Sequence, residues 1–432
     1  MAESSPVSSE RKPRPGWIKK AMIAGAALIV AVIALVWACN RARPECSSFE
    51  SCKRACPDWF QPSAAACVKL GQIYAEGTEV PRDLSSALKL FSWGCEDRDP
   101  DGCRELGLMF NGGRGVSREE ARARKAFERA VTLYDNACAR GEPDGCRGLA
   151  LLVRDGRGIG VDEERSRQLS TKARDLYKSE CDRGATASCL GLAAMLDGGQ
   201  GVDADRSAAQ ELRKKACDRQ DARGCHLAAI ALDQGLGVPK DPAAAVQFYD
   251  RACTAGHSFS CLHLGSIYDN GSSKPVPADP ARAAVLYERA CNDELALACG
   301  KLATLLRDGR GVGKDEARAD KLFRKQSELL SRGCALGKAS DCEFLAGMFS
   351  VIGPFERSDD KAAAAMSKAI ELRQKSCDEG DGGECYVLSG TFERGTGVPK
   401  DEARAARLMH QACTQGFEPA CARKSAEPPA PR

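Results

Sequence analysis

Cysteine is the residue type in this chain with the widest range of possible chemistry, and its spacing is regular. The sequence contains 23 cysteines. Scattered at random, they would give on the order of one pair eight residues apart. Instead the spacing recurs along the whole chain, which indicates a repeated structural use. The pairs are Cys95/Cys103, Cys138/Cys146, Cys181/Cys189, Cys217/Cys225, Cys253/Cys261, Cys291/Cys299, Cys334/Cys342, Cys377/Cys385 and Cys413/Cys421.

These pairs could be disulfides, buried reduced thiols or zinc ligands. Eight residues of one continuous helix span about 12 Å, whereas a disulfide needs Cα atoms within roughly 7 Å. The chain must therefore turn back between the two cysteines if they are bonded, and segments such as Ala255–Ser260 supply glycine and polar residues for a turn. No Cys-x-x-Cys knuckle or Cys/His quartet typical of structural zinc is present. We favour disulfides, and hence an oxidising compartment.

Two further pairs, Cys46/Cys52 and Cys56/Cys67, could complete the disulfide set, although their spacings are irregular.

The composition offers few residues for other kinds of chemistry. The net charge is only +3, and the seven Lys/Arg before position 44 against two Asp/Glu leave a nearly neutral body. That balance argues against nucleic-acid binding. Four histidines are few for acid–base catalysis, and we expect surface or packing roles for His226 and His263. We predict no metal site and no cofactor.

The elements that position the cysteines follow from the repeat length. Successive second cysteines are separated by 36, 38 or 43 residues. The seven extra residues always fall between a glycine turn and the next first cysteine, as between Val116 and Cys138. Seven residues are close to two helical turns, so the segment lengthens while its apolar face stays in register. This part of each repeat is predicted to be a helix.

The first part of each repeat is predicted to be a helix as well. Leucine usually stands three residues after the second cysteine, and a small residue such as Gly71 or Ala229 stands four after it. A Gly-x-Gly-Val turn then ends this helix with a left-handed glycine. Aspartates three residues beyond the turn hydrophobe are placed to cap the second helix: Asp83, Asp162, Asp205, Asp241, Asp279, Asp315 and Asp401.

Antiparallel helix pairs of this kind bury their apolar faces by stacking on one another. We therefore predict an all-α fold, an α-solenoid of about nine disulfide-stapled helix-turn-helix repeats over residues 67–415. Residues 40–66 would be a linker and N-terminal cap. Residues 416–432 would be a truncated cap and a loose tail, because Lys424 replaces the expected leucine and Pro428 follows.

One transmembrane helix is expected to precede the solenoid. Residues 1–20 are polar and basic, and would be a cytoplasmic segment. Ala21–Ala38 is apolar without a break and is flanked by Trp17 and Trp37, so residues 21–39 would form a transmembrane or signal-anchor helix. The competing interpretation is a bacterial lipoprotein signal, with Val36–Cys39 as the lipobox and Cys39 as the lipidated residue. Either interpretation places the repeats outside the cytoplasm, membrane-anchored in the periplasm or beyond it.

The repeat resembles a known family. The pattern A-x-x-L-Y-x-x-A-C-x-x-G…C-x-x-L-G…Y-x-x-G-x-G-V-x-x-D is similar to Sel-1-like repeats, relatives of tetratricopeptide repeats, over about four-fifths of the chain. The cysteine spacing is similar to that of the Helicobacter cysteine-rich proteins, in which a disulfide links successive helices. The resemblance implies a bacterial envelope adaptor that binds a protein or peptide along a concave groove lined by first helices.

Some cysteine-rich relatives are described as β-lactam-binding or β-lactam-hydrolysing, and that chemistry requires a set of motifs. Ser86 and Lys89 form one Ser-x-x-Lys, but no Ser-Asp-Asn or Lys-Thr-Gly accompanies it. We therefore predict no enzyme activity, with action on cell-wall fragments or β-lactams as the alternative function. The expected partner is a protein or peptide of unknown identity.

Overall fold

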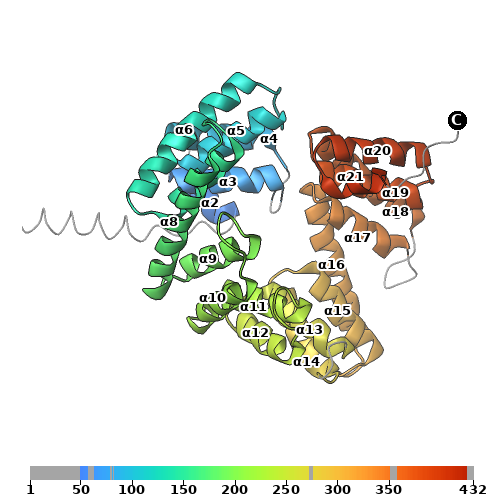
Figure 1. Ribbon diagram of the computed structural model, residues 1–432. Coiled ribbons are helices and arrows are strands. Elements are labelled where there is room, and N and C mark those ends of the chain that lie inside the picture. Colours follow the sequence, from blue (N-terminus) through green and yellow to red (C-terminus); the bar gives the residue numbers. More distant parts are fainter. Residues whose placement is uncertain are drawn as a thin grey trace, which may run out of the picture.

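The protein is a solenoid of stacked helix pairs. The computed structural model describes residues 49–56, 63–77, 80, 82–271, 276–350 and 358–425, and all regular structure in these ranges is helical. Figure 1 shows the pairs following one another around a curve from α2 to α21. The all-α solenoid of helix-turn-helix repeats predicted from the sequence is confirmed for this part of the chain.

Each repeat consists of a first helix and a second helix that run antiparallel. The first helices are α3 (Ala64–Glu76), α5 (Pro100–Gly112), α7 (Pro143–Asp155), α9 (Thr186–Gly198), α11 (Ala222–Gln234), α13 (Ser258–Asn270), α15 (Ala296–Asp308), α17 (Ala339–Ser350) and α19 (Gly382–Arg394). The second helices are α4 (Leu84–Glu96), α6 (Glu120–Ala139), α8 (Glu163–Asp182), α10 (Arg206–Asp218), α12 (Pro242–Thr254), α14 (Pro280–Asn292), α16 (Glu316–Ala335), α18 (Asp359–Asp378) and α20 (Glu402–Thr414). Numbered in chain order, repeat 1 consists of α3 and α4, and repeat 9 consists of α19 and α20. Helix α2 (Phe49–Ala55) precedes the repeats and α21 (Glu418–Ser425) follows them.

The four long repeats owe their length to the second helix. Helices α6, α8, α16 and α18 have 20 residues each, whereas α4, α10, α12, α14 and α20 have 13. The difference is the predicted insertion of two helical turns. Each first helix begins three residues before its second cysteine, as α11 does at Ala222.

The turn between the two helices of a repeat depends on glycine and aspartate. Gly235 ends α11 with φ 73°, and Gly237 follows with φ 74°. A Cβ on Gly237 would collide with the side chain of Arg206 in the preceding repeat. Only glycine combines this left-handed conformation with so close an approach. Each of the seven predicted aspartates then accepts a backbone N–H at the start of its second helix, as Asp241 does from Ala244 at 2.9 Å.

The core lies between helices rather than at one centre. The largest fully buried side chains include Tyr249, Tyr287 and Phe91, all from second helices. The small residues expected in the first helices make room for such rings, since a Cβ on Gly265 would lie 2.6 Å from the ring of Tyr287. The pattern of small residue against aromatic ring lets the two helices approach closely.

Disulfides join the second helix of each repeat to the first helix of the next. All nine pairs spaced by eight residues are bonded, with Cα–Cα distances of 4.4 to 4.7 Å, because the chain turns back between the two helices. The bonds join Cys95 to Cys103, Cys138 to Cys146, Cys181 to Cys189, Cys217 to Cys225, Cys253 to Cys261, Cys291 to Cys299, Cys334 to Cys342, Cys377 to Cys385 and Cys413 to Cys421. Of the three alternatives for these cysteines, the structure has the disulfide.

The irregular pairs lie at the start of the solenoid. Cys56 is bonded to Cys67 with Cα atoms 5.0 Å apart, and Cys52 is in a disulfide. Cys46, the partner predicted for Cys52, lies outside the described residues. Cys39 and the apolar segment Ala21–Ala38 lie outside them as well, so the anchor and the lipidation site stay predictions.

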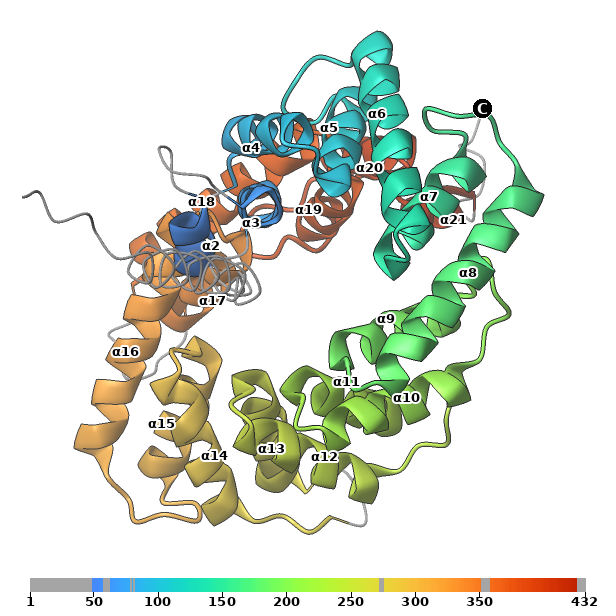
Figure 2. The ribbon, with the colours of Figure 1, turned by 90° about the vertical axis from the view of Figure 1, so that its left-hand side faces the viewer.

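The solenoid curves far enough for its two ends to meet. Figure 2 shows it winding about a central opening, with first helices nearer the opening and second helices outside. Arg82, in the turn of the first repeat, lies 3.6 Å from Glu379 and 3.6 Å from Asp381, between α18 and α19. Solenoid repeats ordinarily contact only their neighbours. This contact therefore closes one turn of the superhelix. None of the helices in the described ranges has the length and hydropathy needed to cross a bilayer.

Candidate interaction surface

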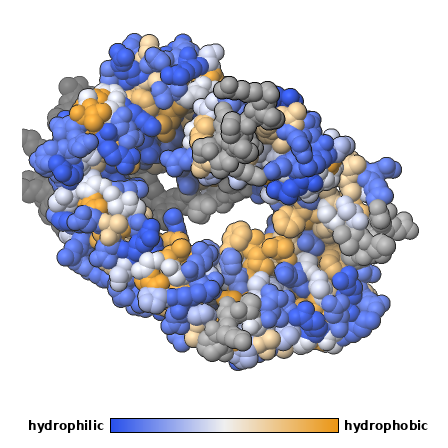
Figure 3. Space-filling view, turned by 45° about the vertical axis from the view of Figure 1, so that its right-hand side comes forward, coloured by the Kyte–Doolittle hydropathy of each residue, from blue (hydrophilic) through white to orange (hydrophobic). Residues whose placement is uncertain are grey.

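Four of the first helices, which lie nearer the central opening, carry exposed apolar side chains. Phe259, Leu297, Phe344 and Val387 are 55%, 43%, 56% and 41% exposed, and they come from α13, α15, α17 and α19. Figure 3 shows hydrophobic surface bordering the central opening. Large apolar groups gathered on one face of a soluble domain are typical of a binding surface.

Three of these residues border one cleft. Phe259, Leu297 and Phe344 lie along a cleft of about 930 Å³ whose lining includes Leu330 of α16. Glu50 of α2 and Val80 of the first turn also line it, so the cleft brings the start of the solenoid next to repeats 6 to 8. The size is that of a site for a small ligand or a few side chains of a peptide.

The sequence reasoning missed this apolar group. Its members stand two residues before or after the second cysteine, and the position two before it holds Asp101, Asp144 or Arg223 in other repeats. A comparison of repeats at these positions could have found them. In the sequence, these positions neighbour those that form the buried apolar face of each helix. Only the curvature of the stack places them on one inner surface.

The cysteines predicted as site residues lie in the junctions, and none of them lines this cleft. Each second cysteine is the fourth residue of its helix, one turn from the N-terminus. Eight of them are no more than 1% exposed, and the ninth, Cys421, is partly buried in α21. The eight are Cys103, Cys146, Cys189, Cys225, Cys261, Cys299, Cys342 and Cys385. Bonded sulfurs this far from solvent are part of the scaffold and offer no reactive thiol.

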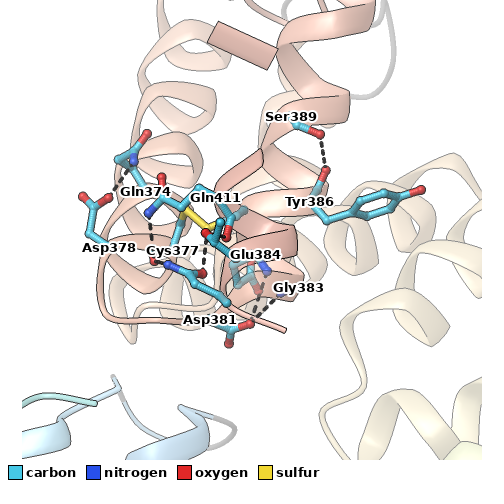
Figure 4. The surroundings of a disulfide bond; sticks show 12 residues. Gln374, Cys377, Asp378, Asp381, Gly383, Glu384, Tyr386, Ser389 and Gln411 are labelled. Carbon is cyan, nitrogen blue, oxygen red and sulfur yellow. Dashed lines mark hydrogen bonds between the residues drawn. A yellow bond between two sulfur atoms is a disulfide. The ribbon is translucent and has the colours of Figure 1, made fainter. Parts of the chain in front are cut away.

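The junction around Cys377 and Cys385 shows how the helix ends are satisfied (Figure 4). Gln411, from the next second helix, donates to the carbonyl of Cys377 at 3.4 Å, and Asp381 caps α19. Similar bonds occur elsewhere, as from Arg251 to the carbonyl of Cys217 at 2.9 Å. These side chains satisfy the open carbonyls at the ends of second helices.

Ser86 lies in the first turn of α4 and supports its cap. Its hydroxyl donates to Asp83 at 2.6 Å, and its backbone N–H donates to the same carboxylate at 3.0 Å. Hydrogen bonds from Ser86 and then Ser85 lower the pKa of Asp83 to about 2. A hydroxyl held by a capping carboxylate at a helix start has the geometry of a structural group, and nothing in the site favours the β-lactam alternative.

Three of the four histidines gather at the junction of repeats 5 and 6. The rings of His226 and His257 stack with centroids 4.1 Å apart, and His263 lies 6.0 Å from His226. Ser260 bridges His226 and His257 at 2.8 and 3.0 Å. Burial, then the neighbouring histidines, lowers the pKa of His226 to about 4. Within the described residues, no three His, Cys, Asp or Glu side chains are arranged to hold a metal ion.

Comparison with known families agrees with the geometry. Residues 64–96, 100–141, 143–177, 186–221, 222–257, 258–294, 296–329 and 385–417 match the Sel1 repeat, eight copies over more than half of the chain. The chain belongs to the Sel1 repeat family. The match omits residues 330–384, although α17 and α18 form the same antiparallel pair there, so this Sel1 repeat protein has nine helix pairs in its described part.

Solved structures of Sel1 repeat proteins are similar to it at low identity. A protective antigen of uropathogenic Escherichia coli with an SLR fold is 23% identical, covering 86% of this chain and 80% of its own, with a TM-score of 0.41. A Sel1 repeat protein from Oxalobacter formigenes is 19% identical, covering 78% of this chain and 89% of its own, with a TM-score of 0.43. A search of curated proteins gave no significant match.

Proposed function

We propose that this Sel1 repeat protein is a membrane-anchored scaffold outside the cytoplasm that binds a protein or peptide on its inner face. The observation that carries the proposal is the group of exposed apolar residues Phe259, Leu297 and Phe344 around one cleft. Exposed aromatic residues in a concave site are the usual anchors of protein binding. The repeats supply shape and no reactive group, so we assign no catalytic role.

The location rests on two separate features of the sequence. The regular disulfides require an oxidising compartment, which for a bacterial chain means the periplasm or the exterior. The apolar segment Ala21–Ala38 is long enough to anchor the chain, either as a helix or as a signal before lipidated Cys39. Fractionation of the source cells tests this, since deletion of residues 21–38 should move the protein out of the membrane fraction.

The binding function is tested by cross-linking the full chain in the envelope of its own cells. Phe259→Asp combined with Phe344→Asp places charges on the inner face, and should abolish a cross-linked partner seen with the wild type. Val285→Asp is the matched control, because Val285 is 68% exposed on α14, a second helix. A cross-linked partner that survives the inner-face change and is lost with the control would contradict the proposal.

A further inference from the structure

In repeats 2 and 3, a buried tyrosine of the long second helix is hydrogen-bonded to an aspartate of the first helix. Tyr134 of α6 donates its hydroxyl to Asp101 of α5 at 2.6 Å, and Tyr177 of α8 donates to Asp144 of α7. Both tyrosines are 2% exposed. In each repeat the tyrosine lies four residues before the first cysteine of the junction, and 33 residues after its aspartate.

Repeat 7 has the same long helix without this pair. Leu330 and Leu297 occupy the two positions, again 33 residues apart. Leucine is shorter than tyrosine and has no hydroxyl, so the side-chain hydrogen bond of repeats 2 and 3 has no counterpart in repeat 7. The 930 Å³ cleft lies there, bordered by both leucines. In repeat 8 the equivalent of the tyrosine is Arg373, which forms ion pairs with Glu343 and Glu384.

The cleft is lined by more carboxylates than cationic side chains. Asp293, Asp341 and Glu50 line it, and no ion pair to any of them is found among the described residues. Of the two cations in the lining, Arg332 pairs with Glu294 at 2.5 Å. Lys338 is the other, and its charge acts on Asp341. Burial nevertheless raises the pKa of Asp341. A cation entering the cleft would find carboxylates that have no salt bridge in the described part of the chain.

We propose that the cleft of repeat 7 receives a bulky apolar side chain of a partner peptide, with a lysine or arginine next to it in the peptide. The leucines and phenylalanines would contact the apolar side chain, and Asp293 and Asp341 the cation. This inference rests on the proposed function as a peptide-binding scaffold. Because Glu50 and Val80 complete the cleft, the bound peptide would contact the start of the solenoid as well as repeats 6 to 8.

The test uses the full-length chain with its disulfides intact and a phage-displayed library of random dodecapeptides. Peptides selected on the wild type should share an aromatic or large aliphatic residue beside Lys or Arg. Their dissociation constants are then measured by fluorescence polarisation. Leu297→Asp combined with Leu330→Tyr rebuilds the pair of repeats 2 and 3 and should fill the cleft. We expect binding to weaken at least about tenfold, as for loss of a hot spot.

Two further variants and one control test the proposal even if the double variant does not fold. Leu297→Glu alone changes a side chain that is 43% exposed, so it should fold even if the double variant does not, and it should also weaken binding. Asp341→Asn should weaken peptides that carry the cation and leave peptides with that cation replaced by glutamine unchanged. Val285→Asp, on the outer face, should bind as the wild type does.

The possible outcomes distinguish failure of the cleft assignment from failure of the proposed peptide-binding function. Selected peptides that bind the wild type and the filled-cleft variant equally would overturn the cleft assignment and leave peptide binding elsewhere on the scaffold standing. Selected peptides without a cation would overturn the charge recognition. A library that yields no specific binder to the wild type would contradict both the cleft assignment and the proposed function.

Discussion

At the residue scale, the cysteines that looked most able to do chemistry serve to hold helices together. Their bonds lie at the junctions, and each spans only eight residues, as from Cys253 to Cys261. A short loop of this kind stabilises the fold by about 2 to 3 kcal/mol in the chain-entropy account. Repeats of a solenoid ordinarily contact only their neighbours, so the stack separates most easily at the junctions between repeats. Each disulfide stabilises one of these junctions.

We therefore predict that replacing Cys253 and Cys261 by alanine weakens one junction without changing the fold. Hydrogen exchange should speed up in α12 and α13 and stay unchanged in α4 and α5, and the local free energy of opening should fall by about 2 to 3 kcal/mol. Complete reduction of the wild type should lower the melting temperature. An unchanged melting temperature in excess reductant would show that the bonds contribute nothing to stability.

The histidine cluster gives a second prediction at this scale, on pH. The pKa of His226 falls from 6.5 to about 4 in the folded chain, chiefly because the ring is desolvated and secondly because His257 and His263 lie beside it. Burial lowers the pKa of His257 too. The unfolded chain thus binds protons first, so stability is fully present above pH 6.5 and is lost as pH falls towards 4.

His226→Gln should remove part of this acid sensitivity. Thermal unfolding between about pH 7 and pH 4 should show a smaller drop in melting temperature for the variant than for the wild type. His410→Gln is the control, because His410 is exposed and outside the cluster, and it should behave as the wild type does. Equal acid sensitivity of the wild type and His226→Gln would contradict the assignment.

At the scale of the element, the sequence predicts the helices well because their lengths and ends follow local rules. The seven-residue insertions predict the long helices, and Asp241 or Gly235 marks an end through its own side chain or backbone. The exposed positions of Phe259 and Leu297 were not predicted. Their exposure depends on which neighbour lies beside each helix, and that depends on the curvature of the whole stack.

One position in the junction loops has a backbone conformation that the sequence analysis did not predict. Three residues after the first cysteine, the backbone is left-handed in every junction, and six junctions have glycine there, such as Gly256 with φ 92°. The other three have Arg98, Gln220 and Glu294, with φ of 68°, 65° and 64°. A side chain in this conformation costs about 1 kcal/mol or more relative to glycine.

Gln220→Gly should therefore stabilise the junction between α10 and α11 by up to about 1 kcal/mol. The reverse change, Gly256→Gln, should destabilise the next junction by a similar amount. A Cβ at Gly256 would meet nothing within 4 Å, so no steric clash adds to the backbone strain. Melting temperatures and hydrogen exchange at the two junctions provide the measurement, and a destabilised Gln220→Gly variant would contradict it.

At the scale of the whole molecule, the closure of the superhelix could not be predicted from the sequence. Each repeat adds a small rotation, and the extra turns in α6, α8, α16 and α18 change it. Their sum decides whether the first repeat meets the last ones, and no local motif encodes that sum. Arg82 resembles any other turn residue in the sequence, and its partners Glu379 and Asp381 are distant in the chain.

Among the described residues, the ion pairs of Arg82 join the first repeat to the junction between α18 and α19. The Arg82 side chain is 14% exposed between two carboxylates, and its Nε and Nη2 atoms have no hydrogen-bond partner. The attraction is therefore electrostatic, between a mostly buried guanidinium and two partly exposed carboxylates. Reversing the charge with Arg82→Glu would bring three carboxylates together and should push the ends of the superhelix apart.

Small-angle X-ray scattering should then report a larger radius of gyration for Arg82→Glu than for the wild type, with unchanged helix content by circular dichroism. Adding Glu379→Arg alone restores an opposite-charge pair in swapped positions, leaves Asp381 to cap α19, and should return the radius towards the wild-type value. Lys400→Glu, which breaks an exposed local pair with Glu402, should leave the radius unchanged. Since Glu50 and Val80 complete the cleft of repeat 7, the opened variant should also bind cleft peptides more weakly, and the variant that carries both Arg82→Glu and Glu379→Arg should recover that binding. Identical scattering from the wild type and Arg82→Glu would mean that packing of the repeats alone, without this contact, sets the curvature.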